Sequence, residues 1–357
     1  MLSTSPIIVI MQGVAAWNHW RRIHDATETD APELREALLI RAELPRINLS
    51  YVDSCISNFS GANLFQANLT QAIFYTANLS QVRLDWAELD GVDMREVNLR
   101  EASLIRVHAK QTNFAMADLH GSNLREAIFT NSNFCEASLA GVDGCMSQMD
   151  QCNLSYTNLE NSLFYTADLG KANFRKANLT AADFREANLT QAILEDVNGL
   201  QANFERAILD RAILTGATLL EANFTMANLK LTILNQANLT NALIQNAILS
   251  GASLVKAKLC DAQLQNSSMD KTDCRNTVFS GANLENVNLQ GADLSGANLS
   301  KARLKGACLT GANLNHTNLS YVDLRETDLA GTDLKHAILK GTKLPHPRAI
   351  ETLANAA

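Results

Sequence analysis

The residues that most often bind metals or act as nucleophiles are sparse in this chain and show no spacing that would bring them together. His19 and His24 lie five residues apart, which does not align two ligands on one face of a helix. The seven cysteines form no CxxC pair, so the sequence favours reduced thiols over disulfides or a zinc site. We therefore expect no cofactor and no metal.

Carboxylates are the remaining candidates for acid–base chemistry. Asp85, Glu88 and Asp90 lie close together in the sequence, but scattered acids of this kind are more simply explained as part of a solvated surface. The chain contains no Ser/His/Asp arrangement and no glycine-rich phosphate loop. Because catalysis needs groups that converge in a concave site, these observations predict that the protein is not an enzyme.

Composition narrows the class of protein further. Of the 357 residues, 46% are apolar, which is enough for a substantial core. The net charge of −7 argues against a nucleic-acid binder, because such proteins need clustered Lys and Arg. The apolar run at 6–11 is too short to span a membrane and lacks the flanks of an export signal. We expect a cytoplasmic protein that binds neither nucleic acid directly nor a membrane.

The dominant pattern in the sequence is a period of five, and this period must determine where the remaining residues lie in the fold. Stepping by five from Leu49 to Leu344 gives sixty pentads without an insertion, and fifty-one of the sixty central residues are Leu or Phe. The residue two places before the centre is small in almost every pentad, and the residue just before the centre is most often Asn or Asp. All five prolines lie outside 46–344, as expected for a continuous hydrogen-bonded ladder.

A period of five fits neither an α-helix nor a straight strand, whose repeats are about 3.6 and 2 residues. If the small residue and the central residue both point inward, and the chain then turns a corner, every central residue faces one axis. Repeated corners produce a coil, and stacked coils produce a solenoid whose inside is lined by leucine.

Stretches such as GADLSGANLSKARLKGACLTGANL at 291–314 resemble the A(D/N)LxG unit of the pentapeptide repeat family. The resemblance implies an all-β solenoid, a right-handed quadrilateral parallel β-helix with four pentads per coil and about fifteen coils. We expect an N-terminal helical cap and lead-in at 1–36, the β-helix at 37–344, and a short C-terminal cap at 345–357.

The N-terminal segment is predicted to form the helical part of that cap. Residues 5–24 are amphipathic, and an AWNxWR-like sequence precedes the repeats in some family members. The resemblance places Trp17 and Trp20 against the first coil. Residues 30–46 are ambiguous, because a capping-box pattern favours a helix while their leucines keep the period of five.

Central residues of unusual size support a coil of twenty residues. Phenylalanines recur at this spacing in two columns: Phe164, Phe184, Phe204 and Phe224, and Phe74, Phe114, Phe134 and Phe174. The four smallest central residues each follow a valine at the small inward position: Ser54, Ala109, Gly144 and Gly199. A larger neighbour would fill the space that a missing leucine leaves, as close packing demands.

Outward positions must carry the function, and isoleucine replaces the usual Asn or Asp at several of them. The candidate partner-binding residues of this kind are Ile193, Ile208, Ile213, Ile233, Leu243 and Ile248. Three of them, Ile193, Ile213 and Ile233, follow one another at the twenty-residue spacing. An apolar strip of this kind marks a contact with a partner. The alternative is a β-branched ladder that supports the sheet.

Two aromatic residues are a second candidate contact. Phe65 and Trp86 lie one coil apart near the N-terminal end of the repeats. An exposed Trp can anchor an interface. The Trp side chain can equally cover the junction between the helical cap and the first coils.

The lack of loops, pockets and metal spacing favours a non-catalytic protein–protein interaction scaffold with a regulatory role, whose partner is a protein of unknown identity. The family offers an alternative, because some pentapeptide repeat proteins resemble a DNA duplex and bind DNA gyrase. Such mimicry needs a sustained negative stripe, whereas acids and bases interleave here, as in Arg185 and Glu186. Family members often pair end to end, which leaves a homodimer through a solenoid end open.

Overall fold

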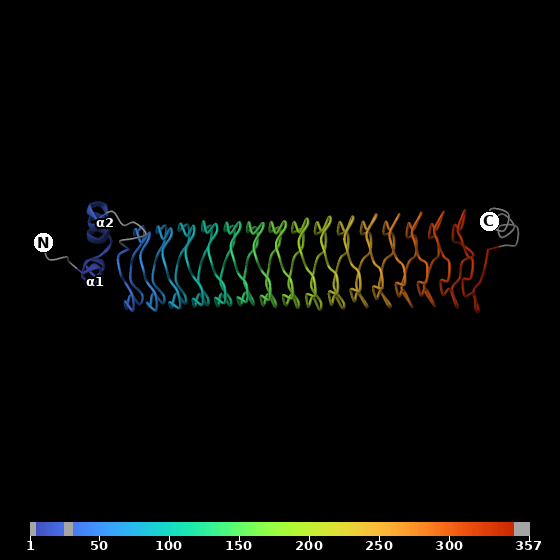
Figure 1. The fold of residues 1–357 in the computed structure, drawn as a ribbon, viewed down its shortest axis with the longest axis horizontal. Helices are drawn as coiled ribbons and strands as arrows, with labels where there is room; N and C mark the ends of the chain where they lie inside the picture. The colour runs from blue at the N-terminus through green and yellow to red at the C-terminus, as the bar shows by residue number, and fades with distance from the viewer. Residues whose placement is uncertain (1–4, 25–30, 346–357) are drawn as a thin grey trace. The chain divides into compact units, whose positions relative to one another are not determined.

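Two short helices precede a long series of regular coils. The computed structural model describes residues 5–24 and 31–345 of the chain. Helix α1 spans Pro6–Ile10 and helix α2 spans Val14–Ile23. The remaining described residues form coils, each side of which is one isolated bridge flanked by turns (Figure 1).

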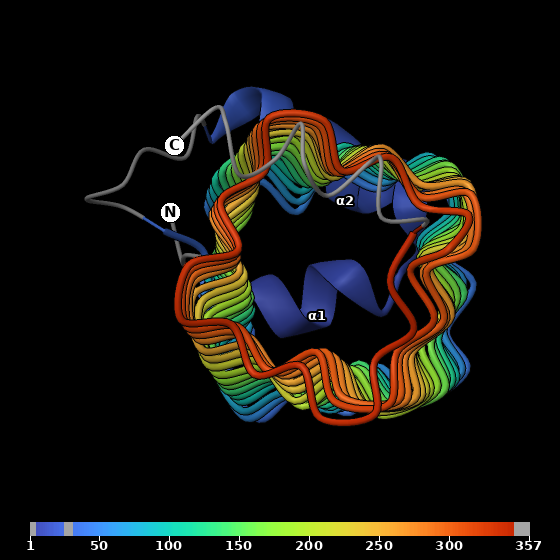
Figure 2. The same ribbon diagram turned by 90° about the vertical axis from the view of Figure 1, so that its right-hand side faces the viewer.

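The chain divides into two units, Met1–Asn178 and Leu179–Ala357. Within each unit, an outward residue pairs in parallel with the outward residue twenty places later, as Asn58 does with Asn78. Four such bridges per coil give the coils of each unit the four-sided outline that Figure 2 shows. The bridges agree with the coil of twenty residues that the phenylalanine spacing predicts.

The ladder begins earlier than the sequence indicates. Its first bridge joins Glu33 and Asp53, whereas the expected start was residue 37. Leu34 and Leu39 are buried, because the period of five already holds over these residues. The five-residue frame therefore outweighs the helical capping pattern in this segment.

The link at 25–30 lies outside the described residues, and so does the expected C-terminal cap at 345–357 except for Pro345.

A tight turn makes each corner of a coil. The carbonyl of the central Leu49 accepts a hydrogen bond from the N–H of Val52 at 3.2 Å. Between them, Tyr51 has a φ of 58°, the positive value that the third residue of a type II turn adopts. Glycine adopts such a φ without steric strain, which explains why the glycines of the repeats favour this place, as at Gly281 with a φ of 72°.

The Asn or Asp just before each centre stabilises the corner that follows it. The Oδ1 atom of Asn68 accepts a hydrogen bond from the N–H of Thr70 at 2.9 Å, and this side-chain turn recurs along the chain. Asn side chains satisfy such corner N–H groups locally. Some also link successive coils, since Asn133 Nδ2 donates to Asn113 Oδ1 at 3.1 Å.

The phenylalanines stack inside the coils. In the second unit, the ring centroids of Phe184 and Phe204 lie 5.2 Å apart, and those of Phe204 and Phe224 lie 4.8 Å apart. In the first unit, Phe114 and Phe134 stack at 4.8 Å. All five side chains are fully buried. These contacts confirm the inward position and the column for these five residues.

The two glycines at central positions are covered from the following coil. A Cβ atom at Gly144 would overlap the Cε1 of Phe164, and one at Gly199 would lie 2.8 Å from the Cδ2 of Leu219. The central side chain twenty places later therefore occupies the space of the missing leucine. The sequence indicated only the preceding valine as the compensating residue, because stacking between coils is not visible within one pentad.

Three side chains of α2 bind the edge of the first coil. Trp17 Nε1 donates to the carbonyl of Asn48 at 2.6 Å, and Asn18 Oδ1 accepts from the N–H of Asn48 at 2.8 Å. Arg21 Nη2 donates to the carbonyl of Ser50 at 2.8 Å. In later coils the equivalent backbone groups bond to the coil before them. These side chains thus make the bonds that a preceding coil would make.

The two tryptophans of α2 have different surroundings. Trp17 is fully buried, in agreement with a position against the first coil. Trp20 is only partly buried, and its ring stacks on His24 with the centroids 4.6 Å apart.

Candidate partner-binding surface

The three isoleucines at twenty-residue spacing form one continuous column in the second unit. Ile193 bridges Ile213, and Ile213 bridges Ile233. Ile233 is 37% exposed, while the other two side chains are partly buried. The column ends at Ser253, the next residue in the ladder. Apolar surface therefore extends over three successive coils of one wall.

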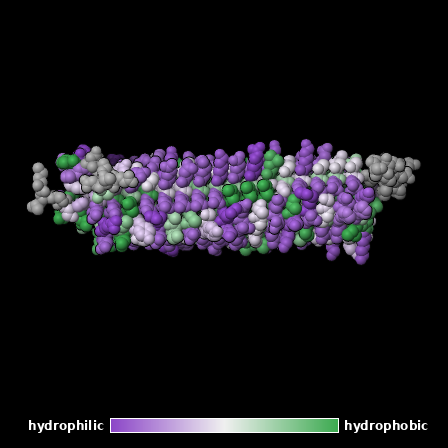
Figure 3. All heavy atoms as spheres, viewed as in Figure 1, coloured by the Kyte–Doolittle hydropathy of each residue, from purple (hydrophilic) through white to green (hydrophobic). Residues whose placement is uncertain are grey.

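The neighbouring walls and corners add further apolar side chains. Ile208 and Ile248 lie on the adjacent wall, and Leu243 lies on the wall before that; all three are exposed. Met226 and Leu231 occupy the corners between these walls and are 50% and 40% exposed. Figure 3 shows apolar groups of this kind as small patches on an otherwise hydrophilic surface.

We define the apolar band as these eight side chains: Ile193, Ile208, Ile213, Met226, Leu231, Ile233, Leu243 and Ile248. Six of these residues are the predicted candidates, and the band covers parts of three walls, with Leu243 on the wall opposite the column of three isoleucines. Sequence reasoning missed Met226 and Leu231, because aliphatic residues were sought only at the outward wall positions and the corners were searched only for aromatic residues. A search for large apolar residues at the second corner position, where glycine and polar residues prevail, would have found both.

Charged residues around the band pair with neighbours of opposite sign. Arg206 Nη1 lies 3.6 Å from Glu186 Oε1, and Arg211 Nη1 lies 3.7 Å from Asp210 Oδ2. Exposed pairs of this kind contribute little to stability. Because the signs alternate, they also create no sustained field along the walls. The band therefore offers apolar contact rather than electrostatic steering.

Phe65 and Trp86 lie at one corner of successive coils in the first unit, each beneath an arginine. The guanidinium of Arg83 lies 4.6 Å from the ring centroid of Phe65, and that of Arg106 lies 4.8 Å from the ring of Trp86. These are cation–π contacts, which cover one face of each ring. Trp86 is still 46% exposed, so its ring remains accessible.

Chemically reactive groups are buried or dispersed. Burial raises the pKa of Cys152 to about 12 and that of Cys274 to about 12, because the apolar interior disfavours the thiolate. Among residues 5–24 and 31–345, no group of three or more His, Cys, Asp or Glu side chains could hold a metal ion. The geometry of this surface is suited to binding, since it gathers apolar area and no convergent reactive groups.

The repeats identify the family of the chain. A model of pentapeptide repeats matches eight times, over segments that run from residue 57 to residue 344. The chain belongs to the pentapeptide repeat family, whose members fold as right-handed quadrilateral β-helices.

Solved structures of family members resemble parts of the chain. HetL, a pentapeptide repeat protein involved in the regulation of heterocyst differentiation in the cyanobacterium Nostoc sp. strain PCC 7120, is 32% identical, with 62% of this chain and 89% of HetL covered and a TM-score of 0.25. Full-length QnrB1, a plasmid-mediated fluoroquinolone resistance protein, is 19% identical, with 67% and 96% covered and a TM-score of 0.32. Because both TM-scores are below 0.5, the family assignment rests on the repeat model.

A comparison with curated proteins gives no match. Neither α1 nor α2, the helices of the described residues, is long and apolar enough to cross a membrane.

Proposed function

We propose that this protein is a non-catalytic scaffold with a regulatory role, which binds another protein through the outer walls of its coils. The observation that carries the proposal is the apolar band, eight apolar side chains on three walls of the coils between residues 193 and 248. Burying an exposed apolar patch against a partner is favourable, because it removes apolar surface from water. The interior is packed with central side chains, so the outer walls are the surface that can bind.

The alternative role of the isoleucines is to support the sheet through cross-strand pairs. This role accounts for the column of Ile193, Ile213 and Ile233. It does not account for Met226 and Leu231, since these corner residues lie outside the bridged positions and are at least 40% exposed. Leu231 lies at the corner next to the wall of the column, and Met226 lies at the corner before it. Their exposure favours a contact surface.

A DNA-mimicking modulator of gyrase is the other function that the family suggests. Such a protein needs a sustained acidic stripe to imitate the phosphate backbone. Here acidic residues pair with arginines, as Glu186 does with Arg206 and Asp183 does with Arg185. We therefore favour the scaffold.

The finer architecture is part of the same proposal. We propose about fifteen coils, with α2 as the N-terminal cap and the segment 345–357 as the C-terminal cap. The hydrogen bonds of Trp17 and Arg21 to the first coil support the N-terminal cap. A homodimer through a solenoid end, and a second contact at Phe65 and Trp86, remain proposals.

The double variant Ile213→Asn/Ile233→Asn tests the scaffold. In a pull-down from the native cell, we expect the variant to capture at least about tenfold less partner than the unchanged protein, because two apolar anchors are removed. The free energy of unfolding should change by no more than about 1 kcal/mol, since both positions face outward. The measurement is quantitative mass spectrometry of the captured proteins, alongside denaturant unfolding.

Ile73→Asn is the matched control. Ile73 occupies the same kind of outward position in the first unit and is 38% exposed, but its ladder neighbours are Asp53 and Asp93. This variant should retain the partner. Retained binding by the double variant, or an equal loss with Ile73→Asn, would reject the apolar band as the contact.

A further inference from the structure

The backbone ladder is interrupted at one place in the second unit. From Asp183 to Asp323, every outward residue bridges the residue twenty places later except Arg303, which does not bridge Asp323. On the same wall, Arg303 is bridged to Asn283 and Asp323 is bridged to Lys343. The interruption is therefore confined to one side of one coil.

The interruption leaves backbone groups without their usual partners. In the regular ladder, Leu299 N–H donates to the carbonyl of Asn318 and Asn318 N–H donates to the carbonyl of Ala297, at 2.8 and 2.9 Å. The equivalent bonds, from Leu304 N–H and from Asp323 N–H, are absent from this described segment. Buried or half-buried backbone groups need a partner, either water or a ligand.

The next bond along the same side is displaced by one residue. Gly306 N–H donates to the carbonyl of Glu326 at 2.9 Å, where the regular pattern would use Arg325. A local shift of this kind re-aims side chains and often adjoins a binding site.

Ion pairs explain why the two coils separate here. Arg303 Nη2 lies 2.6 Å from Glu285 Oε1 in the preceding coil. Asp323 Oδ2 lies 2.6 Å from Arg325 Nη2 and 3.6 Å from Lys343 Nζ in the following coil. Arg303 and Asp323 therefore turn away from each other, although they have opposite charge and occupy neighbouring places in the ladder.

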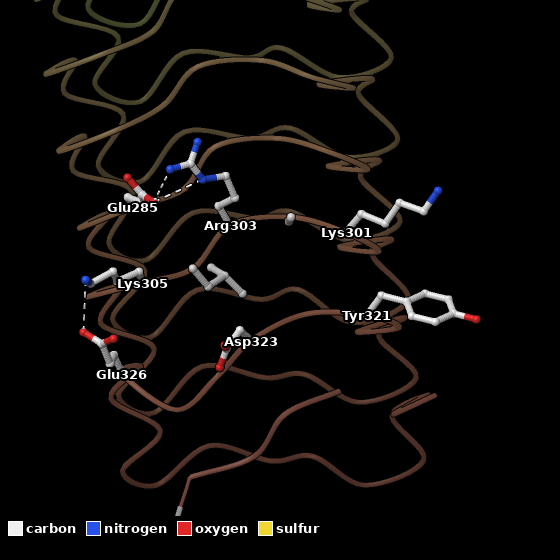
Figure 4. A pocket seen from close by; sticks show the side chains of 9 residues that line it. Glu285, Lys301, Arg303, Lys305, Tyr321, Asp323 and Glu326 are labelled. Carbon is white, nitrogen blue, oxygen red and sulfur yellow. Dashed lines mark hydrogen bonds and ion pairs between the residues drawn. The ribbon is translucent and has the colours of Figure 1, made fainter. Parts of the chain in front are cut away.

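A cavity of about 280 Å³ opens at this interruption. Ala302 and Leu304 are among its lining residues, and Lys301 and Tyr321 lie on one side of it (Figure 4). On the other side, Lys305 Nζ lies 3.5 Å from Glu326 Oε2. The volume is close to the lower limit of small-ligand pockets, about 300 Å³.

The charges around the cavity favour an anion. Its three carboxylates already have cationic partners: Glu285 faces Arg303, Asp323 faces Arg325, and Glu326 faces Lys305. Lys301 has no carboxylate within 4.0 Å among residues 31–345. The Lys301 side chain lies on the same side as Tyr321 and extends away from Asp323 (Figure 4), so its ammonium group would turn inward to meet a ligand.

We propose that this cavity binds a carboxylate with an adjacent amide, the chemistry shared by a peptide C-terminus and an N-acylated amino acid. Lys301 would hold the carboxylate charge, and the free N–H groups of Leu304 and Asp323 would donate to its oxygens. The unused carbonyl of Ala302 would accept the amide N–H of the ligand, as in the pairing of a peptide with an exposed backbone edge. The site is independent of the apolar band, so either proposal can fail without the other.

Binding can be followed by amide NMR of the full chain, at the resonances of Leu304 and Asp323. The probes are acetyl-Ala-Ala-Ala with a free carboxylate, the same peptide with a C-terminal amide, and N-acetylalanine. We expect saturable shifts with the free carboxylate and binding about tenfold weaker for the amidated peptide, because the charge-assisted bonds are lost. If N-acetylalanine binds as tightly as the tripeptide acid, the ligand is an N-acylated amino acid. If the tripeptide acid binds more tightly, the ligand is the C-terminus of a peptide.

Lys301→Gln should weaken binding of the free carboxylate about tenfold, whereas Lys301→Arg should retain it. Lys256→Gln is the control, because Lys256 is also an exposed corner lysine of the second unit and does not line the cavity. The absence of saturable shifts at 10 mM probe (roughly the weak limit of specific recognition) would overturn the proposal and leave water as the partner of these groups. Equal shifts with the acid and the amide, or no effect of Lys301→Gln, would overturn it as well.

Discussion

Phe204→Ala should lower the free energy of unfolding by about 3–5 kcal/mol, one of the two largest effects expected from a single substitution in this chain. The ring is fully buried and stacks on Phe184 and Phe224, with centroids 5.2 and 4.8 Å away. Alanine would leave a cavity between two rigid rings, and the hydrogen-bonded ladder prevents the coils from closing around it. Equilibrium urea unfolding measures the loss.

Asn203→Ala is the matched control, because it changes the adjacent residue on the outward side. It removes a hydrogen bond from Asn223 Nδ2 at 3.1 Å and one from the N–H of Glu205 at 3.1 Å. Partly exposed hydrogen bonds contribute about 1 kcal/mol each or less. A loss as large as that of Phe204→Ala would contradict the assignment of the two residues to opposite sides of the wall.

Trp17→Ala should open the first coil of the chain while leaving the second unit intact. The substitution removes a fully buried ring and its hydrogen bond to the carbonyl of Asn48, which should cost about 3–5 kcal/mol. Because the residues described before this edge, 5–24, are largely helical and form no coil, we expect the loss to appear as local unfolding. Native-state hydrogen exchange at the amides of Leu39 and Leu44 measures it, since both bond to the next coil.

Trp20→Ala provides the comparison for that experiment. Trp20 is only partly buried, and its recorded ring contacts are with Trp17 and His24 in the same helix. Its removal should lower protection of the first coil by much less. Equal losses from both variants, or a loss of protection in the second unit with Trp17→Ala, would show that Trp17 does not seal this edge.

The period of five was sufficient to predict which residues point inward. A central residue such as Phe204 and an outward residue such as Ile233 differ only by their place in the pentad, and the structure buries the first and exposes the second. This works because each corner resets the direction of the chain, so that sequence position alone determines the side of the wall. The coils start at Glu33, whereas the sequence predicts a start at residue 37. A periodic pattern is easy to detect, but the residue at which it begins is harder to locate.

Details that depend on contacts between coils could not be predicted from one pentad at a time. Arg303 and Asp323 have opposite charge and lie twenty residues apart, so the period alone would place them next to each other as a pair. The structure pairs Arg303 with Glu285 instead, and the ladder opens beneath it. The choice between partners above and below depends on rotamers, which the repeat does not encode.

Every proposal for the outer walls requires that residues twenty places apart lie in one column. Thr218 and Asn318 belong to the same column and are joined by five successive bridges. Spin labels can be attached to cysteines at these two positions after Cys135, Cys260 and Cys308, the native thiols that are not buried, are replaced by serine.

Double electron–electron resonance spectroscopy then measures the distance between the two spin labels. Five coil steps at the spacing of parallel strands predict a single narrow peak at about 24 Å, within roughly 20–30 Å once the label linkers are included. A broad distribution, or a peak well outside this range, would contradict the stacked coils and with them the assignment of function to the outer walls.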